Sequence, residues 1–161
     1  MNAEQLQQAL DDVLDHALVY HAFTRYMRDY ELIVYVTADP RTGIPPVHLR
    51  YLFRYCVEAL VESTVAVDTW RRSLDERLIR YDTGVDLDGY VWGVNSHVLY
   101  PGMSVMSPSA RAEKWSADIG IDFQEVHIES NAHNISLIFS DLSVTEVGEG
   151  YAPFVTAIEK D

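Results

Sequence analysis

The chain has 161 residues, of which 48% are apolar and 11% are aromatic, and this composition excludes a disordered acidic tail. Lys and Arg number 12 against 25 Asp and Glu, so the net charge is −13, which excludes nucleic acid and anionic membranes as general partners. The length suits one domain. We therefore expect a single domain over residues 1–150 and a C-terminal tail over residues 151–161.

The cysteine content and the first residues of the chain indicate the cellular compartment of the protein. The lone Cys56 has no partner for an intramolecular disulfide, which suits a reducing cytosol. Residues 1–8 lack the basic and apolar regions of a secretory signal, and no stretch approaches 18 apolar residues. We expect a cytoplasmic protein in which Cys56, placed within an apolar run, is buried and structural.

The first part of the chain predicts one helix and two strands. Residues 3–17 place apolar side chains at helical spacing, with acidic and amide side chains on the other side. Residues 19–24 and 30–38 are rich in Tyr, Ile and Val, which is typical of strands. Asp39-Pro40-Arg41-Thr42-Gly43 predicts a turn, because Asp accepts local hydrogen bonds, Pro fixes φ and Gly permits positive φ.

Residues 47–65 match two patterns. At a period of two, alternate residues form one apolar face; at a period of 3.6, apolar residues form a stripe beside an i, i+4 ladder of charges. The Val, Tyr, Phe and Thr content favours a strand, and a strand of this length requires a bend or a bulge. A helix remains the alternative.

The second part of the chain predicts two helices and a hairpin. One helix is capped by Asp68, and another begins at Ser107-Pro108 and ends at Gly120. Strands are expected over residues 89–100, 103–106, 123–130, 133–140 and 142–147. The strands at 123–130 and 133–140 form the hairpin, and its core residues are Val126, Ile128, Ile135, Leu137 and Phe139.

The expected strands outnumber the expected helices, and the connections are short. We therefore predict an α+β fold, an antiparallel or mixed β-sheet with two to three helices packed against it. In this fold residues 88–100 and 122–140 belong to one sheet, which buries Trp70 and Trp115.

Five strings of the sequence stand out together. They are Tyr26-Met27-Arg28-Asp29-Tyr30-Glu31, Thr37-Ala38-Asp39-Pro40-Arg41-Thr42-Gly43-Ile44-Pro45-Pro46, Trp70-Arg71-Arg72-Ser73-Leu74-Asp75, Asp88-Gly89-Tyr90-Val91-Trp92-Gly93-Val94 and Leu99-Tyr100-Pro101-Gly102-Met103. On these strings the chain resembles the YxiG-like proteins, small uncharacterised bacterial proteins, over most of residues 1–147. The resemblance implies no activity and no functional residues. The founding member's neighbourhood, near a secreted toxin gene, implies an immunity or accessory role.

The sequence lacks the common catalytic and phosphate-binding motifs. It has no G-x-S-x-G elbow, no Walker loop, no G-x-G-x-x-G and no H-E-x-x-H. Its six histidines are scattered, so we expect neither a metal site nor a cofactor. An enzyme or small-molecule binder with a site assembled from distant residues is the alternative function, and its candidates are Tyr90, Trp92, His97 and Asp39.

The acidic charge is concentrated late in the chain. Residues 82–161 contain 3 basic and 13 acidic residues, a net charge of −10. Glu125 and Glu129 share one face of a predicted strand, opposite Val126 and Ile128. Tyr and Trp are enriched where proteins bind partners. We therefore expect a partner-binding face formed by Glu125, Glu129, Asp86, Asp88, Tyr90 and Trp92.

These observations favour a non-enzymatic protein that binds a basic protein, as an immunity or accessory factor. An acidic field increases the rate of encounter with a cationic partner by one to three orders of magnitude at low salt. A homodimer formed through a self-complementary sheet edge is a third alternative.

Overall fold

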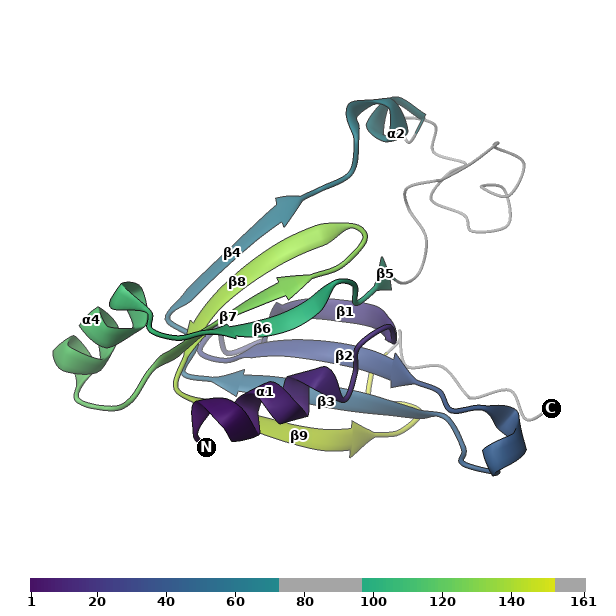
Figure 1. Cartoon of the computed structure of the whole chain (residues 1–161), viewed down its shortest axis with the longest axis horizontal. Coiled ribbons are helices and arrows are strands. Elements are labelled where there is room, and N and C mark those ends of the chain that lie inside the picture. Colours follow the sequence, from purple (N-terminus) through teal and green to yellow (C-terminus); the bar gives the residue numbers. More distant parts are fainter. Residues whose placement is uncertain (73–96, 153–161) are drawn as a thin grey trace.

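The computed structural model describes residues 1–72 and 97–152 (Figure 1). The helices in these ranges are α1 (Ala3–Asp11), α2 (Val67–Arg72) and α4 (Ala110–Ile119), with a 3-10 turn η1 (Pro40–Thr42). The strands are β1 (Ala17–Phe23), β2 (Tyr30–Val36), β3 (Val47–Arg54), β4 (Glu58–Ser63), β5 (His97–Val98), β6 (Gly102–Met106), β7 (Gln124–Glu129), β8 (His133–Phe139) and β9 (Asp141–Val147). The predicted strand residues 89–96 and tail residues 153–161 lie outside the described ranges.

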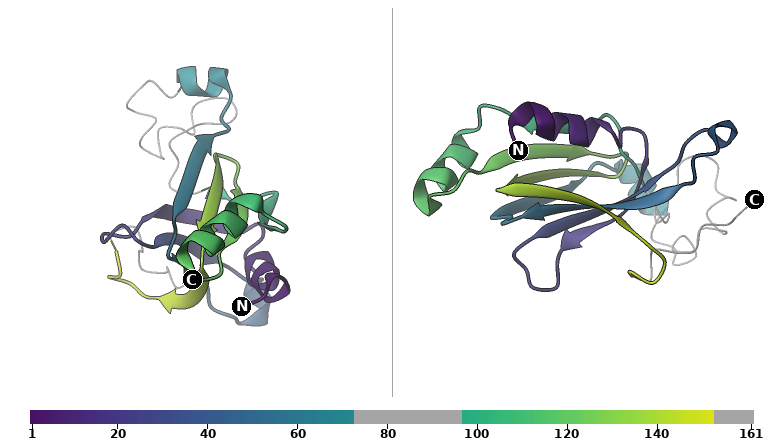
Figure 2. Two further views of the ribbon diagram at one scale, coloured as in Figure 1. Left: turned by 90° about the vertical axis from the view of Figure 1, so that its left-hand side faces the viewer. Right: turned by 90° about the horizontal axis from the view of Figure 1, so that it is seen from below.

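The strands form two antiparallel sheets. One has five strands in the order β5-β1-β2-β3-β9, and the other has four in the order β4-β8-β7-β6. Figure 2 shows the two sheets as layers, with α1 beside β6. The α+β class is therefore confirmed, with the strands divided between two sheets.

One apolar core lies between the two sheets. Phe53 of β3 meets Phe139 of β8 edge to face, with ring centroids 4.8 Å apart. Leu6 and Leu10 of α1 complete this core from the side. The predicted core of the hairpin is confirmed, because each of its residues is buried: Val126, Ile128, Ile135, Leu137 and Phe139.

Helix α1 is shorter than its sequence pattern predicts. The Asn2 side chain accepts from the backbone N–H of Gln5, and the Gln5 side chain accepts in return from that of Asn2, so a capping box begins the helix. The helix ends at Asp11 rather than at residue 17. Ala17 is instead the first residue of β1, because it pairs with both β2 and β5.

Residues 47–65 are strand, as favoured, but they form two strands in different sheets. Tyr55 has a positive φ of 50° and lies between them. The bend transfers the chain from β3, paired with β2 and β9, to β4, paired with β8. The required break in a long strand is therefore a corner between sheets.

Three details of the chain after β4 differ from expectation. Helix α4 is capped by Ser109 and not by Ser107, because the Ser109 side chain accepts the backbone N–H of Ala112. Trp70 is exposed rather than buried, since α2 lies at the far end of β4, away from the core (Figure 1). Strand β5 pairs with β1, so it does not share a sheet with the hairpin.

Candidate functional site

Two residues of the predicted partner-binding face lie in the described ranges, and both are on β7. Glu129 is half-buried, and Glu125 is buried. Sequence alternation places Glu125 correctly on the outer face of the sheet, but α4 covers that face here. Glu125, expected on a partner-binding face, is therefore buried in the folded chain. The other members of the predicted face lie outside the described residues: Asp86, Asp88, Tyr90 and Trp92.

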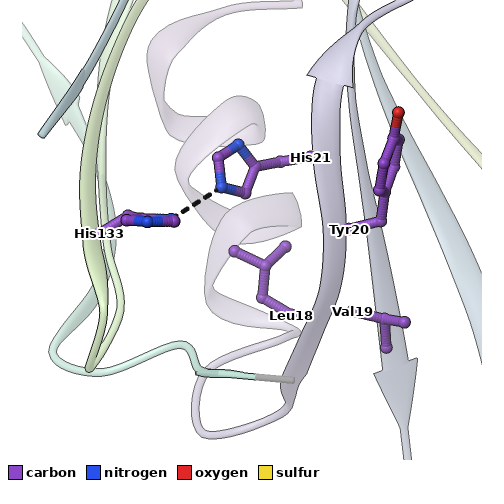
Figure 3. A pocket seen from close by; sticks show the side chains of 5 residues that line it. All are labelled: Leu18, Val19, Tyr20, His21 and His133. Carbon is purple, nitrogen blue, oxygen red and sulfur yellow. Dashed lines mark hydrogen bonds between the residues drawn. The ribbon is translucent and has the colours of Figure 1, made fainter. Parts of the chain in front are cut away.

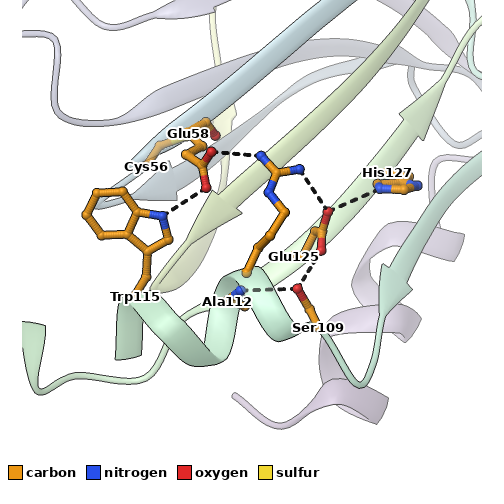
Figure 4. Close-up of polar contacts among 8 residues, drawn as sticks. Cys56, Glu58, Ser109, Ala112, Trp115, Glu125 and His127 are labelled. Carbon is orange, nitrogen blue, oxygen red and sulfur yellow. Dashed lines mark hydrogen bonds and ion pairs between the residues drawn. The ribbon is translucent and has the colours of Figure 1, made fainter. Parts of the chain in front are cut away.

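Glu125 belongs to a polar cluster between α4 and the sheet (Figure 4). The Ser109 hydroxyl donates to one carboxylate oxygen over 2.5 Å. The other oxygen lies 3.7 Å from the Arg111 guanidinium and 3.3 Å from Nε2 of His127. Both oxygens of this carboxylate therefore have neighbours within its own chain.

Glu58 on β4 extends the same cluster. Arg111 donates to one of its oxygens over 2.7 Å, and Nε1 of Trp115 donates to the other over 2.8 Å. The Arg111 hydrogen bond, assisted by that of Trp115, lowers the pKa of Glu58. Because Arg111 reaches both β4 and β7, the cluster fastens α4 across the sheet.

The polar cluster does not have the geometry of a nucleophilic site. An activated serine donates to a base, which a third group then orients. Glu125 could serve as such a base, but it is buried beneath α4, and the Ser109 hydroxyl also accepts the backbone N–H of Ala112 as the N-cap of α4. We interpret these contacts as structural.

Cys56 has the buried position expected from the sequence. It is 7% exposed, and its thiol donates to the backbone oxygen of Glu58 over 3.3 Å. Burial raises the pKa of Cys56 to about 12. A thiol in this state is a small apolar core group and a poor nucleophile at neutral pH.

Two candidates for the alternative, assembled site also fall in the described ranges. Asp39 caps η1 and accepts from the backbone and the guanidinium of Arg41. The Arg41 side chain lowers the pKa of Asp39. His97 begins the short strand β5. Asp39 therefore has a local role in the turn that its own sequence pattern predicts.

A small cavity of about 190 Å³ opens beside β1 (Figure 3). Nε2 of His21 on β1 lies 3.0 Å from Nδ1 of His133 on β8, and Nδ1 of His21 lies 2.7 Å from the Tyr30 hydroxyl. The histidine pair therefore connects the two sheets. Ligand cavities commonly exceed about 300 Å³, and the described part of the chain holds no group of three metal-ligating side chains.

A further group of side chains lies on two adjacent loops, β1–β2 and β3–β4. We define the tyrosine–arginine cluster as Tyr26, Met27, Arg28 and Tyr55. The Arg28 guanidinium carbon lies 4.4 Å from the Tyr55 ring centroid and 5.7 Å from that of Tyr26, which is cation–π geometry. The backbone oxygen of Arg28 accepts from the N–H of Cys56, so the loops are joined directly.

Asp29 lies beneath this cluster and holds it in place. Its side chain is 1% exposed and accepts two hydrogen bonds from Arg28, at 2.8 and 3.0 Å. It also accepts from the Tyr26 hydroxyl at 2.8 Å and from the backbone N–H of Tyr55 at 3.0 Å. These bonds, that of Arg28 first, lower the pKa of Asp29 to about 2.

The cluster combines side chains that are held by a buried carboxylate with side chains that are exposed to solvent. Tyr55, Tyr26 and Met27 are 47%, 58% and 80% exposed. Met27 and Tyr55 have positive φ values of 61° and 50°, a conformation that non-glycine residues keep only where their surroundings impose it. The sequence contains a signal for part of this group, because Tyr26-Met27-Arg28-Asp29-Tyr30-Glu31 is one of the strings that carry the family resemblance. It does not show that Tyr55 joins it.

The fold and these sites define a two-sheet α+β protein with an ordered, exposed aromatic cluster at one end of its larger sheet. The chain belongs to the YxiG-like protein family, whose profile matches residues 2–157. It matches none of the curated proteins with which it was compared. None of the helices in the described ranges has the length and apolar content needed to cross a bilayer.

Proposed function

We propose that this chain is a non-enzymatic protein that binds another protein through the tyrosine–arginine cluster. The observation that carries the proposal is the combination of three exposed large side chains with a buried carboxylate, Asp29, which binds the Tyr26 hydroxyl, the Arg28 guanidinium and the Tyr55 backbone. Residue types alone support a binding surface, because Tyr, Arg and Met are enriched at interfaces and Tyr and Arg at their hot spots.

The fixed position of Arg28 in the cluster supports a binding role in addition to the residue types. Each mobile side chain that is ordered on binding costs about 0.5–1.5 kcal/mol. Arg28 is held by Asp29 and stacks on Tyr55, so much of this cost falls on folding instead of on binding. Asp29 also neutralises the charge of Arg28. A partner would therefore contact mainly the rings of Tyr26 and Tyr55 and the side chain of Met27.

The charge of the whole chain suggests the chemistry of the partner. A net charge of −13 attracts a basic protein over distances at which local contacts do not act. We propose a basic partner that is steered by this field and docks on the cluster, in the cytoplasm, where Cys56 stays reduced. An immunity or accessory role is the setting that the family resemblance supports.

Photocrosslinking in the source cells tests the proposal. A photoreactive amino acid replaces Met27 in one variant and Tyr100 in a matched control, because Tyr100 is a similarly exposed aromatic outside the cluster (64%). We expect a discrete adduct from position 27 that position 100 does not produce. Adducts of the same proteins in equal yield from both positions, or none from position 27, would contradict the proposal.

Binding measurements with the identified partner then distinguish the loss of a contact surface from the loss of the folded structure. Tyr55→Ala removes the ring that stacks on Arg28, while the backbone hydrogen bond to Asp29 remains. We expect Tyr55→Ala and Met27→Asp to weaken binding at least about tenfold, which is about 1.4 kcal/mol. Tyr100→Ala should leave affinity unchanged. Association should slow steeply with salt if the partner is basic.

A further inference from the structure

The two edges of the four-stranded sheet differ in how they are protected. At the β6 edge, the Gln7 side chain of α1 donates to the backbone oxygen of Met103 over 3.0 Å and accepts from the N–H of Val105 over 2.8 Å. This amide takes the place of a neighbouring strand. An unpaired edge strand can pair with a strand of another chain, and the Gln7 amide blocks such pairing at β6.

The opposite edge, β4, has no comparable cover among the described residues. Thr64 N–H donates to the Ala132 oxygen, in register with the pairs from Glu58–Ile138 to Ser63–His133. Because bonded and non-bonded pairs alternate in an antiparallel ladder, the backbone groups of three residues point outward from this edge. These residues are Ala59, Val61 and Ser63.

Strand β4 carries two large apolar side chains that are exposed at this edge, between Glu58 and Glu62. Leu60 is 51% exposed and Val61 is 43% exposed. Lys, Pro and bulges, which commonly protect an edge strand, are absent from Glu58–Ser63. Figure 1 shows β4 on the outer side of the sheet, with the chain leaving its end toward α2.

The order of residues in β4 favours pairing with itself. An antiparallel pairing centred on Val61 places the two Val61 side chains opposite each other, Leu60 opposite Glu62, and Ala59 opposite Ser63. A shift of the pairing by two residues in either direction keeps the same backbone groups hydrogen-bonded. One shift places Glu58 opposite Glu62 of the second copy, and the other places the two Glu62 side chains opposite each other. Like charges directly opposite are destabilising, so one register is selected.

We propose that β4 pairs antiparallel with β4 of a second copy of this chain, centred on Val61. The two four-stranded sheets then form one continuous sheet across a two-fold axis, an isologous contact. Each copy carries a charge of −13, so the copies repel each other at long range. Dimerisation therefore strengthens as salt is raised, which is the opposite of the salt effect proposed for the basic partner.

Sedimentation equilibrium of the full chain tests this inference. We expect a mass of twice 18.3 kDa at micromolar concentration, and a dissociation constant that falls with added salt. Val61→Lys places like charges opposite each other and should raise the dissociation constant at least tenfold. Val144→Lys is the matched control, because Val144 is similarly exposed (40%) on β9 in the other sheet, and it should dimerise like the wild type.

Disulfide trapping tests the register. Residues directly opposite in a bonded pair lie about 5.5 Å apart at Cα, within reach of a disulfide. Val61→Cys should therefore form a crosslinked dimer on mild oxidation and Leu60→Cys should not, while the buried Cys56 stays unreacted. A monomer at every concentration would assign this edge to a different chain and overturn the proposal. Equal weakening by both lysine variants, or faster crosslinking at residue 60, would also overturn it.

Discussion

Replacing Asp29 by Asn should destabilise the protein in a strongly pH-dependent way. The folded pKa of Asp29 is about 2, against an ordinary value of 3.8, and this carboxylate is almost fully buried. At about 1.4 kcal/mol per pH unit, the difference stabilises the folded protein by about 2 kcal/mol at neutral pH. Asparagine also turns an amide N–H₂ toward the donors of Arg28 and Tyr55, so we expect a total loss of about 2–3 kcal/mol at pH 7.

The pH dependence distinguishes a charge effect from a packing effect. Because the folded pKa is lowered, the stabilisation by Asp29 is complete above about pH 5 and is lost as the pH falls through 4 toward 2. Urea unfolding, followed by tryptophan fluorescence at pH 7, 5 and 3, should therefore show wild type and Asp29→Asn converging in acid. A constant gap between them would refute the assigned ion pair.

Asp39→Asn is the matched control for this experiment. Asp39 also accepts from an arginine, over 2.7 Å, but its side chain is 45% exposed and that of Arg41 is 91% exposed. Exposed ion pairs contribute little, because water and salt screen them. We expect no measurable shift of the urea midpoint for Asp39→Asn, and an equal loss at both positions would mean that burial of Asp29 is irrelevant.

Three further outcomes follow from the structure. Glu125→Gln should lower the free energy of unfolding by about 1–3 kcal/mol because it disturbs a buried carboxylate network, whereas Glu129→Gln should have little effect, as urea denaturation can show. Cys56 should resist thiol reagents at pH 7 in the folded protein and react fully in urea; rapid native labelling would disprove its burial. Gly102→Ala should be destabilising by more than about 1 kcal/mol in thermal unfolding, because φ of Gly102 is +123°, a backbone conformation that residues with a Cβ rarely adopt; an unchanged midpoint would contradict this.

Local patterns predicted the strands well and their assignment to sheets poorly. The alternation in residues 123–140 identified the hairpin and its core, because alternate side chains of a strand always face opposite sides. A break within residues 47–65 was predicted from the length of the strand, but a change of sheet was not predicted at either corner. Tyr55 separates β3 from β4, and Ser140 alone separates β8 from β9, yet the chain changes sheet at both places.

The candidate site was predictable only in part, for a related reason. Alternation showed which face of β7 holds Glu125, but not that α4 covers this face, since that depends on contacts with residues of β4. The tyrosine–arginine cluster likewise needs Tyr55, which the folded chain brings to Asp29 from 26 positions away. The contacts of α4 with β4 and the contact of Tyr55 with Asp29 join distant segments, so the local sequence does not indicate them.

The pairing of β3 with β9 affects how this protein is made. Arg54 of β3 pairs with Asp141 of β9, so the five-stranded sheet cannot be completed until nearly all of the described chain has left the ribosome. Pairings between distant segments slow folding, because loop closure precedes the contacts that reward it. Until β9 pairs with it, β3 is an open edge that other nascent chains can reach. Slow synthesis or high expression at high temperature should therefore favour aggregation before the native sheet is closed.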